Sequence, residues 1–126
     1  MLREDLERYL NRGDELGFVK EADAPAFLGW ILLRKRKANQ RLLSLLDPDR
    51  EGELLAKEQS LDAQPYQVRV IELARDVFED DRYETNEDFR MNGVYYFSSL
   101  DDVERFVGTF GHSLDNIKWR IEINAP

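Results

Sequence analysis

The densest group of side chains that could do chemistry is the acidic run at residues 79–88, EDDRYETNED, which holds six carboxylates and one arginine. Paired carboxylates can act as general acid and general base, as they do in glycoside hydrolysis. With 26 acidic residues among 126, however, some pair will lie at a suitable separation by chance. The run therefore does not by itself indicate an enzyme.

A second candidate is His112, the only histidine, which follows Gly111 in a predicted loop. A histidine base in nucleophilic catalysis works with a nucleophile and an orienting group, and neither a Gly-x-Ser-x-Gly motif nor a cysteine accompanies it. The ordinary alternative is a surface or helix-terminal histidine. We predict that the chain has no catalytic residue and is not an enzyme.

Residue counts also restrict the possible metal and cofactor sites. One histidine and no cysteine exclude ligand clusters of those two types. The acidic run lacks the glycine and the spaced terminal glutamate of an EF-hand loop, and no glycine-rich phosphate loop occurs. We therefore expect neither a metal nor a cofactor.

Two interpretations of the acidic run stay open, a solvated loop and a protein-binding surface. In the second, carboxylates surround an aromatic anchor, an arrangement that suits recognition of a cationic protein. The residues predicted to bind a partner are Glu79, Asp80, Asp81, Tyr83, Glu84, Glu87 and Asp88.

The formal net charge of −8 is unevenly distributed along the chain. Residues 1–60 hold 11 basic against 12 acidic residues, whereas residues 61–126 hold 7 against 14, which gives −1 and −7. Such a field repels nucleic acid and anionic lipid and attracts basic partners. We therefore expect no direct nucleic-acid partner and no membrane partner.

The basic stretch RKRKANQR at residues 34–41 stands against this trend. On a helix, it could touch phosphates or an acidic partner. The simpler interpretation is that its charges lie on all sides of the helix and compensate the acidic half within the molecule.

Length and composition indicate one globular domain, residues 1–126, with 42% apolar and 35% charged residues. The N-terminus lacks the apolar core of a secretory signal, and the longest apolar run, residues 26–33, is less than half of a membrane span. Because there is no cysteine for a disulfide, we expect a cytoplasmic location.

The N-terminal half is predicted to be helical. Apolar residues from Leu2 to Leu10 fall on one helical face, and Gly13 would end that helix. A second helix is predicted from Pro25 to about Leu46, because its apolar residues recur at threes and fours. Residues 49–59 are predicted to add one or two further helical turns.

Strands are predicted in the second half, at about 66–73, 88–97 and 117–123, from β-branched content and from alternation. A helical repeat also fits residues 70–78, so residues 74–80 are either helix or an extension of the strand. The dipeptide Asn92-Gly93 predicts a tight hairpin turn.

After the hairpin segment, Ser98 or Ser99 would cap a helix that ends at Gly111. Trp30 and Trp119 are both predicted to lie in the core. The expected fold class is α+β, with a helical N-terminal half packed on a small, mainly antiparallel β-sheet and one helix between the last strands.

The stretch GVYYFSSLDDVERFVGTFG at residues 93–111, an aromatic strand that runs into a capped helix, is similar to segments of bacterial immunity proteins. The whole chain resembles those proteins in being small, acidic, cysteine-free and α+β. They include the immunity proteins of contact-dependent growth inhibition, which bind and block the toxic C-terminal domain of a large exported protein. The resemblance implies a cognate basic toxin domain as partner, with a nuclease as the expected toxin.

Two alternatives from other functional classes stay open. A small carboxylate-dependent enzyme would need a concave pocket that holds an acid of strongly shifted pKa. A regulatory or adaptor domain that uses residues 34–41 on nucleic acid would bind with steep salt dependence.

Overall fold

The computed structural model describes residues 1–22, 24–36, 63–80 and 86–126. In that part of the chain the helices are α1 (Arg3–Arg12), α4 (Arg75–Glu79) and α5 (Leu100–Gly108), with short 3-10 turns η1 (Asn86–Asp88) and η2 (Leu114–Asn116). The strands are β1 (Leu16–Lys20), β2 (Phe27–Lys35), β3 (Tyr66–Ala74), β4 (Phe89–Phe97) and β5 (Lys118–Trp119). No helix in the described ranges has the length and apolar character needed to cross a membrane.

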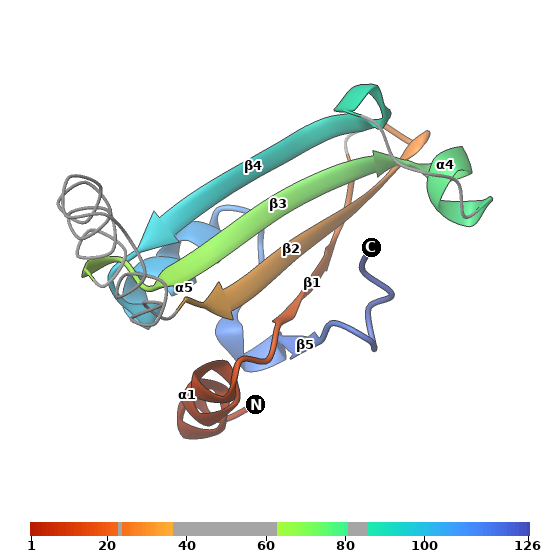
Figure 1. Cartoon of the computed structure of the whole chain (residues 1–126). Helices are drawn as coiled ribbons and strands as arrows, with labels where there is room; N and C mark the ends of the chain where they lie inside the picture. The colour runs from red at the N-terminus through yellow and green to blue at the C-terminus, as the bar shows by residue number, and fades with distance from the viewer. Residues whose placement is uncertain (23, 37–62, 81–85) are drawn as a thin grey trace, which may run out of the picture.

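The five strands form one antiparallel sheet in the order β4-β3-β2-β1-β5 (Figure 1). Strands β1 to β4 pair in chain order, and β5 adds to the outer edge of β1. In Figure 1, α5 lies behind the sheet. The expected α+β class is confirmed.

The helix predicted from Pro25 is wrong over its described part, because Phe27–Lys35 forms strand β2. This strand lies between β1 and β3 and is buried on both faces, so its apolar residues do not alternate with polar ones. Ile31 packs on one face of the sheet and Trp30 on the other. The idea of a helical N-terminal half therefore fails, since α1 is the only helix described there; residues 37–46 and 49–59 lie outside the described residues.

Strands β3 and β4 agree with the prediction, but the hairpin at Asn92-Gly93 is wrong. Both residues lie inside β4, where Asn92 pairs with Ile71 and Gly93 pairs with Val70. A Cβ atom on Gly93 would lie 2.9 Å from the ring of Tyr95, so the glycine makes room for an aromatic side chain. Pairing with β3 along the whole strand has overridden the local turn preference of the dipeptide.

The predicted strand at 117–123 is mostly wrong as well. Only Lys118 and Trp119 pair with β1, and the chain then turns, with Asn124 at φ 50°. Ile123 is buried, whereas Ile121 is 85% exposed. The segment 120–126, called the tail below, instead crosses a face of the sheet.

The predicted helix ends are largely confirmed. α1 is followed by Gly13 in the left-handed conformation at φ 97°, and the backbone N–H of Asp102 donates to the Ser99 hydroxyl at the start of α5. α5 ends at Gly108 and not at Gly111, which lies in the following turn at φ 82°. After β3, residues 75–79 form the short helix α4, which resolves the alternative left open for residues 74–80.

Two apolar layers cover the sheet. One face, called the helix face, packs against α1 and α5, and the opposite face, called the tail face, packs against α4 and the tail. The buried residues of the helix-face layer are Leu6, Leu10, Leu16, Phe18, Ile31, Leu33, Val68, Val70, Leu100, Val103, Val107, Leu114 and Ile117. Those of the tail-face layer are Trp30, Leu32, Ile71, Leu73, Val77 and Ile123.

The two tryptophans differ in burial. Trp30 is 3% exposed, and its indole N–H donates to the backbone carbonyl of Ile123 at 2.8 Å, which holds the tail on the sheet. Trp119 is only half-buried, with its ring centroid 4.5 Å from that of Tyr9. The expectation of a core position is confirmed for Trp30 alone.

We predict that Trp30→Phe lowers the free energy of unfolding by about 2 kcal/mol, because it leaves the buried carbonyl of Ile123 without its donor. Urea denaturation followed by circular dichroism measures this change. Ile121→Ala is the matched control in the same segment and should alter stability by less than about 0.5 kcal/mol. Equal stability of Trp30→Phe and the parent would contradict the role given to this hydrogen bond.

Candidate functional site

The described part of the acidic run lies at one end of the sheet. α4 continues directly from β3, and η1 leads directly into β4. Because Leu73 pairs with Phe89, the two short segments are held at the same end of the two strands (Figure 1). We call this region the acidic end.

The predicted partner-binding residues are placed there as follows. Glu79 and Asp80 are exposed at the C-terminus of α4, and in η1 Glu87 is exposed and Asp88 is half-buried. The structure thus brings Glu79, Asp80, Glu87 and Asp88 to one end of the molecule. The other three predicted residues, Asp81, Tyr83 and Glu84, lie outside the described residues.

Two further carboxylates join this region, and sequence reasoning missed them. Glu21 directly follows β1, and Asp76 lies in α4; both are exposed. Glu21 shares a pocket with Arg75, the residue that opens α4. Arg75 itself forms an ion pair with Glu79 at 3.6 Å, but both partners are exposed, so the pair adds little stability.

A buried ion cluster supports the acidic end from inside the fold. Glu72 is 0% exposed; its Oε1 accepts from Lys20 Nζ at 2.6 Å and its Oε2 accepts from Arg90 at 2.9 Å. Lys20 is 7% exposed, and its ammonium lies 5.7 Å from the ring centroid of Phe110. The cluster therefore joins β1, β3 and β4 across the helix face.

A β-bulge positions Arg90 for this contact. Glu72 pairs with Met91 and Leu73 pairs with Phe89, so Arg90 is the additional residue of the bulge. A bulge of this kind redirects a side chain out of the regular alternation. The sequence signal for this cluster was the single acid, Glu72, in the mainly apolar segment QVRVIELA. An acid that is buried in a strand requires a cation nearby.

His112 lines a pocket of about 630 Å³ together with Lys20, Glu21, Met91 and Phe110. Its ring stacks on Phe18, with centroids 4.8 Å apart, and it forms no side-chain hydrogen bond with any described residue. The one hydroxyl among the described lining residues of this pocket, that of Thr109, donates to the carbonyl of Phe106. This geometry gives the imidazole a packing contact.

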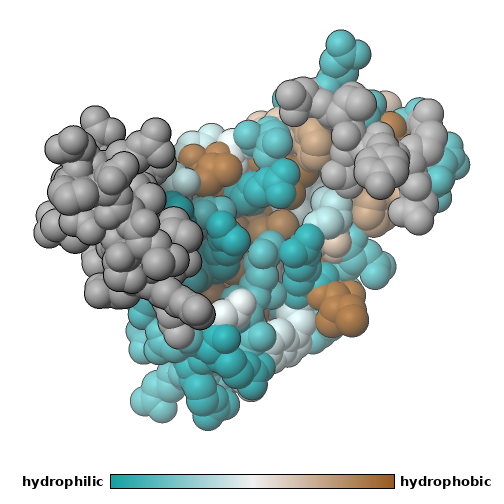
Figure 2. Space-filling model, viewed as in Figure 1, coloured by the Kyte–Doolittle hydropathy of each residue, from teal (hydrophilic) through white to brown (hydrophobic). Residues whose placement is uncertain are grey.

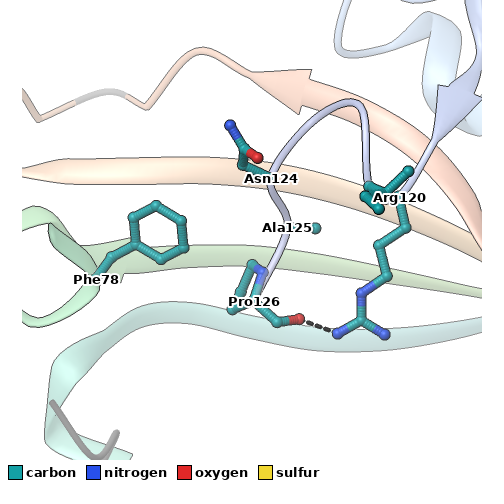
Figure 3. A pocket seen from close by; sticks show the side chains of 6 residues that line it. Phe78, Arg120, Asn124, Ala125 and Pro126 are labelled. Carbon is teal, nitrogen blue, oxygen red and sulfur yellow. Dashed lines mark hydrogen bonds between the residues drawn. The ribbon is translucent and has the colours of Figure 1, made fainter. Parts of the chain in front are cut away.

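A pocket of about 690 Å³ lies where the tail crosses the sheet, and Figure 3 shows its lining residues. Phe78 of α4 faces the segment Asn124–Pro126, and Arg120 donates to the carbonyl of Pro126. The described side chains that line it include no acid, histidine or hydroxyl. In the described ranges, no group of three or more His, Cys, Asp or Glu residues could hold a metal ion.

We predict that Glu72→Gln lowers the free energy of unfolding by about 3–5 kcal/mol, because it leaves the buried Lys20 ammonium without its counter-charge. Arg90→Gln should have a smaller effect, since the Arg90 side chain is 40% exposed and can be solvated after the change. Chemical denaturation measures both. Glu79→Gln, an exposed acid at the same end, is the control, and a loss as large for it as for Glu72→Gln would refute the assignment.

Comparison with known proteins leaves the site to be interpreted from its own side chains. No protein-family model, no curated protein and no solved structure matches the chain. Function must therefore be argued from the charges, contacts and burial described above.

Proposed function

We propose that the chain is an immunity protein that binds and neutralises a basic toxin domain through its acidic end. The observation that carries this proposal is the convergence of exposed carboxylates from separate segments on one end of the sheet. Glu21 comes from the end of β1, Asp76, Glu79 and Asp80 come from α4 and its C-terminus, and Glu87 comes from η1.

Electrostatics favours this role. The chain carries −8, of which −7 lies in residues 61–126, so a basic partner is attracted before contact. A toxin that acts on nucleic acid exposes a basic cleft for phosphates, and carboxylates held at the end of a rigid sheet can occupy the same positions. The toxin expected from this match is a nuclease whose active site is covered in the complex.

The support beneath the acidic end also suits recognition. Glu72 is fully buried, and its two oxygens are engaged by Lys20 and Arg90, so it acts as an anchor for three strands. A general acid or base would instead need access to a substrate proton. A rigid base beneath exposed charges reduces the ordering cost on binding, which favours affinity.

The test replaces Glu79, Asp80 and Glu87 together by Gln, Asn and Gln. Association with the toxin domain against which the chain protects cells should slow by about tenfold or more at low salt, and by less at high salt, because screening removes steering. Stopped-flow kinetics across a salt series measures the rate. The toxin is identified beforehand by survival of cells that express it together with the chain.

The matched control changes the same net charge elsewhere. Glu4 and Glu7 are exposed on α1 and Asp115 is exposed in η2; replacing them by Gln, Gln and Asn should leave the association rate within about twofold. Equal slowing by both triple variants would show that only net charge matters. An unchanged rate for the acidic-end variant at every salt concentration would overturn the proposed binding surface.

A further inference from the structure

A small polar pocket on the tail face gathers three arginines. It has a volume of about 240 Å³ and is lined by Glu15, Leu32, Arg34, Gln67, Arg69 and Arg120. Strand register explains the grouping: Arg34 pairs with Gln67 and Leu32 pairs with Arg69, so Arg34 and Arg69 occupy diagonal positions on β2 and β3. Figure 2 shows hydrophilic side chains gathered over the middle of this face.

Two arginines of this pocket, Arg34 and Arg69, are held by neutral groups. Arg34 donates to the Gln67 amide oxygen at 3.1 Å, and Arg69 Nε donates to the Asn92 amide oxygen at 2.9 Å. Among the described residues, no carboxylate lies within 4.0 Å of either guanidinium. Arg120 alone pairs with an acid, Glu15, at 3.6 Å.

This arrangement is unusual for an acidic chain with carboxylates to spare. The described arginines that do form ion pairs with a carboxylate are Arg3, Arg8, Arg12, Arg75, Arg90, Arg105 and Arg120. An amide acceptor orients a guanidinium without neutralising it. The guanidinium groups of Arg34 and Arg69 therefore keep their positive charge, and each has further N–H donors for a ligand.

We propose that this pocket binds the phosphate group of a small phosphomonoester. Three guanidinium groups against one acidic side chain, that of Glu15, give the lining a net positive charge, which attracts the −1.5 to −2 that a phosphomonoester carries near pH 7. The planar guanidinium forks fit phosphate oxygens. The volume is below the ~300–1,000 Å³ of typical ligand pockets, so the occupant is a compact anion and its small substituent.

The neighbouring surface favours an organic substituent on that phosphate. Tyr96 pairs with Gln67 across β3 and β4 and is 41% exposed on the tail face. Arg36 lies over its ring, with the guanidinium carbon 5.0 Å from the ring centroid. A further cation and an aromatic ring thus lie next to Gln67, a lining residue of the pocket, on the side of β4. This site is independent of the acidic end and of the toxin-binding role.

Binding is tested on the full chain by calorimetric titration with glycerol 3-phosphate at constant ionic strength. We expect saturable binding with a Kd below about 1 mM. Arg34→Gln/Arg69→Gln should weaken it by about tenfold or more, and Arg34→Gln alone, at an exposed position that folding tolerates, by a smaller factor. The control Arg8→Gln/Arg105→Gln removes the same charge from exposed arginines on helices and should leave the Kd within about twofold.

A pH series adds a second readout. Because the second pKa of a phosphomonoester lies near 6, affinity should fall as the solution is acidified from about pH 7.5 to about pH 5.5, although the chain becomes less negative over that range. Absence of saturation, unchanged binding by the Arg34/Arg69 variant, or equal loss in the control would overturn the proposal. So would equally tight binding of succinate, or binding of single-stranded oligonucleotide alone.

Discussion

The structure depends on the burial of β2 on both of its faces. A strand that carries Trp30 and Leu32 on one side and Ile31 and Leu33 on the other needs two apolar covers. α1 and α5 supply the first, and the tail and α4 supply the second. Burial of each large apolar side chain contributes about 1.5–3 kcal/mol of stability. Both faces of β2 therefore favour a fold in which other elements cover them.

Among the described residues, α4 and the tail cover only part of the tail face. The tail protects the half of the tail face around Trp30 and Ile71, where Ile123 is buried. Toward the other end of β2 and β3, the same face carries Arg34, Gln67 and Arg69 and opens into a polar pocket. In the described part of the chain, one face of the sheet thus combines an apolar layer with a polar pocket.

Charge in the described residues is separated along the strands. Carboxylates of Glu21, Glu79 and Glu87 are exposed at the end where β3 leads into α4, above the buried Lys20–Glu72–Arg90 cluster. Arginines gather toward the opposite end, on the tail face. A molecule with such polarity orients a charged partner during approach, in addition to attracting it. The two proposed surfaces have opposite sign and can therefore serve different ligands.

The sequence by itself determined the parts of the fold that depend on local interactions. The glycine that ends α1, the serine cap of α5 and the alternating strand at 66–73 were all predictable, because each depends on residues close in the chain. The placement of Glu79, Asp80, Glu87 and Asp88 near one another also followed from their proximity in sequence.

Tertiary structure decided whatever depends on distant partners. The run at 27–33 has a helical repeat as well as strand character, and only its position between β1 and β3 selects the strand. That choice also placed the first residues of the basic stretch. Alternation in a strand puts Arg34 on the tail face and Lys35 on the opposite face, whereas a helix would spread the charges around its axis. The Glu72 cluster and the arginine pocket join residues more than 30 positions apart, such as Lys20 with Glu72 and Arg34 with Gln67. Periodicity within a segment carries no information about which segments become neighbours, so the pairing of strands brought these sites into existence.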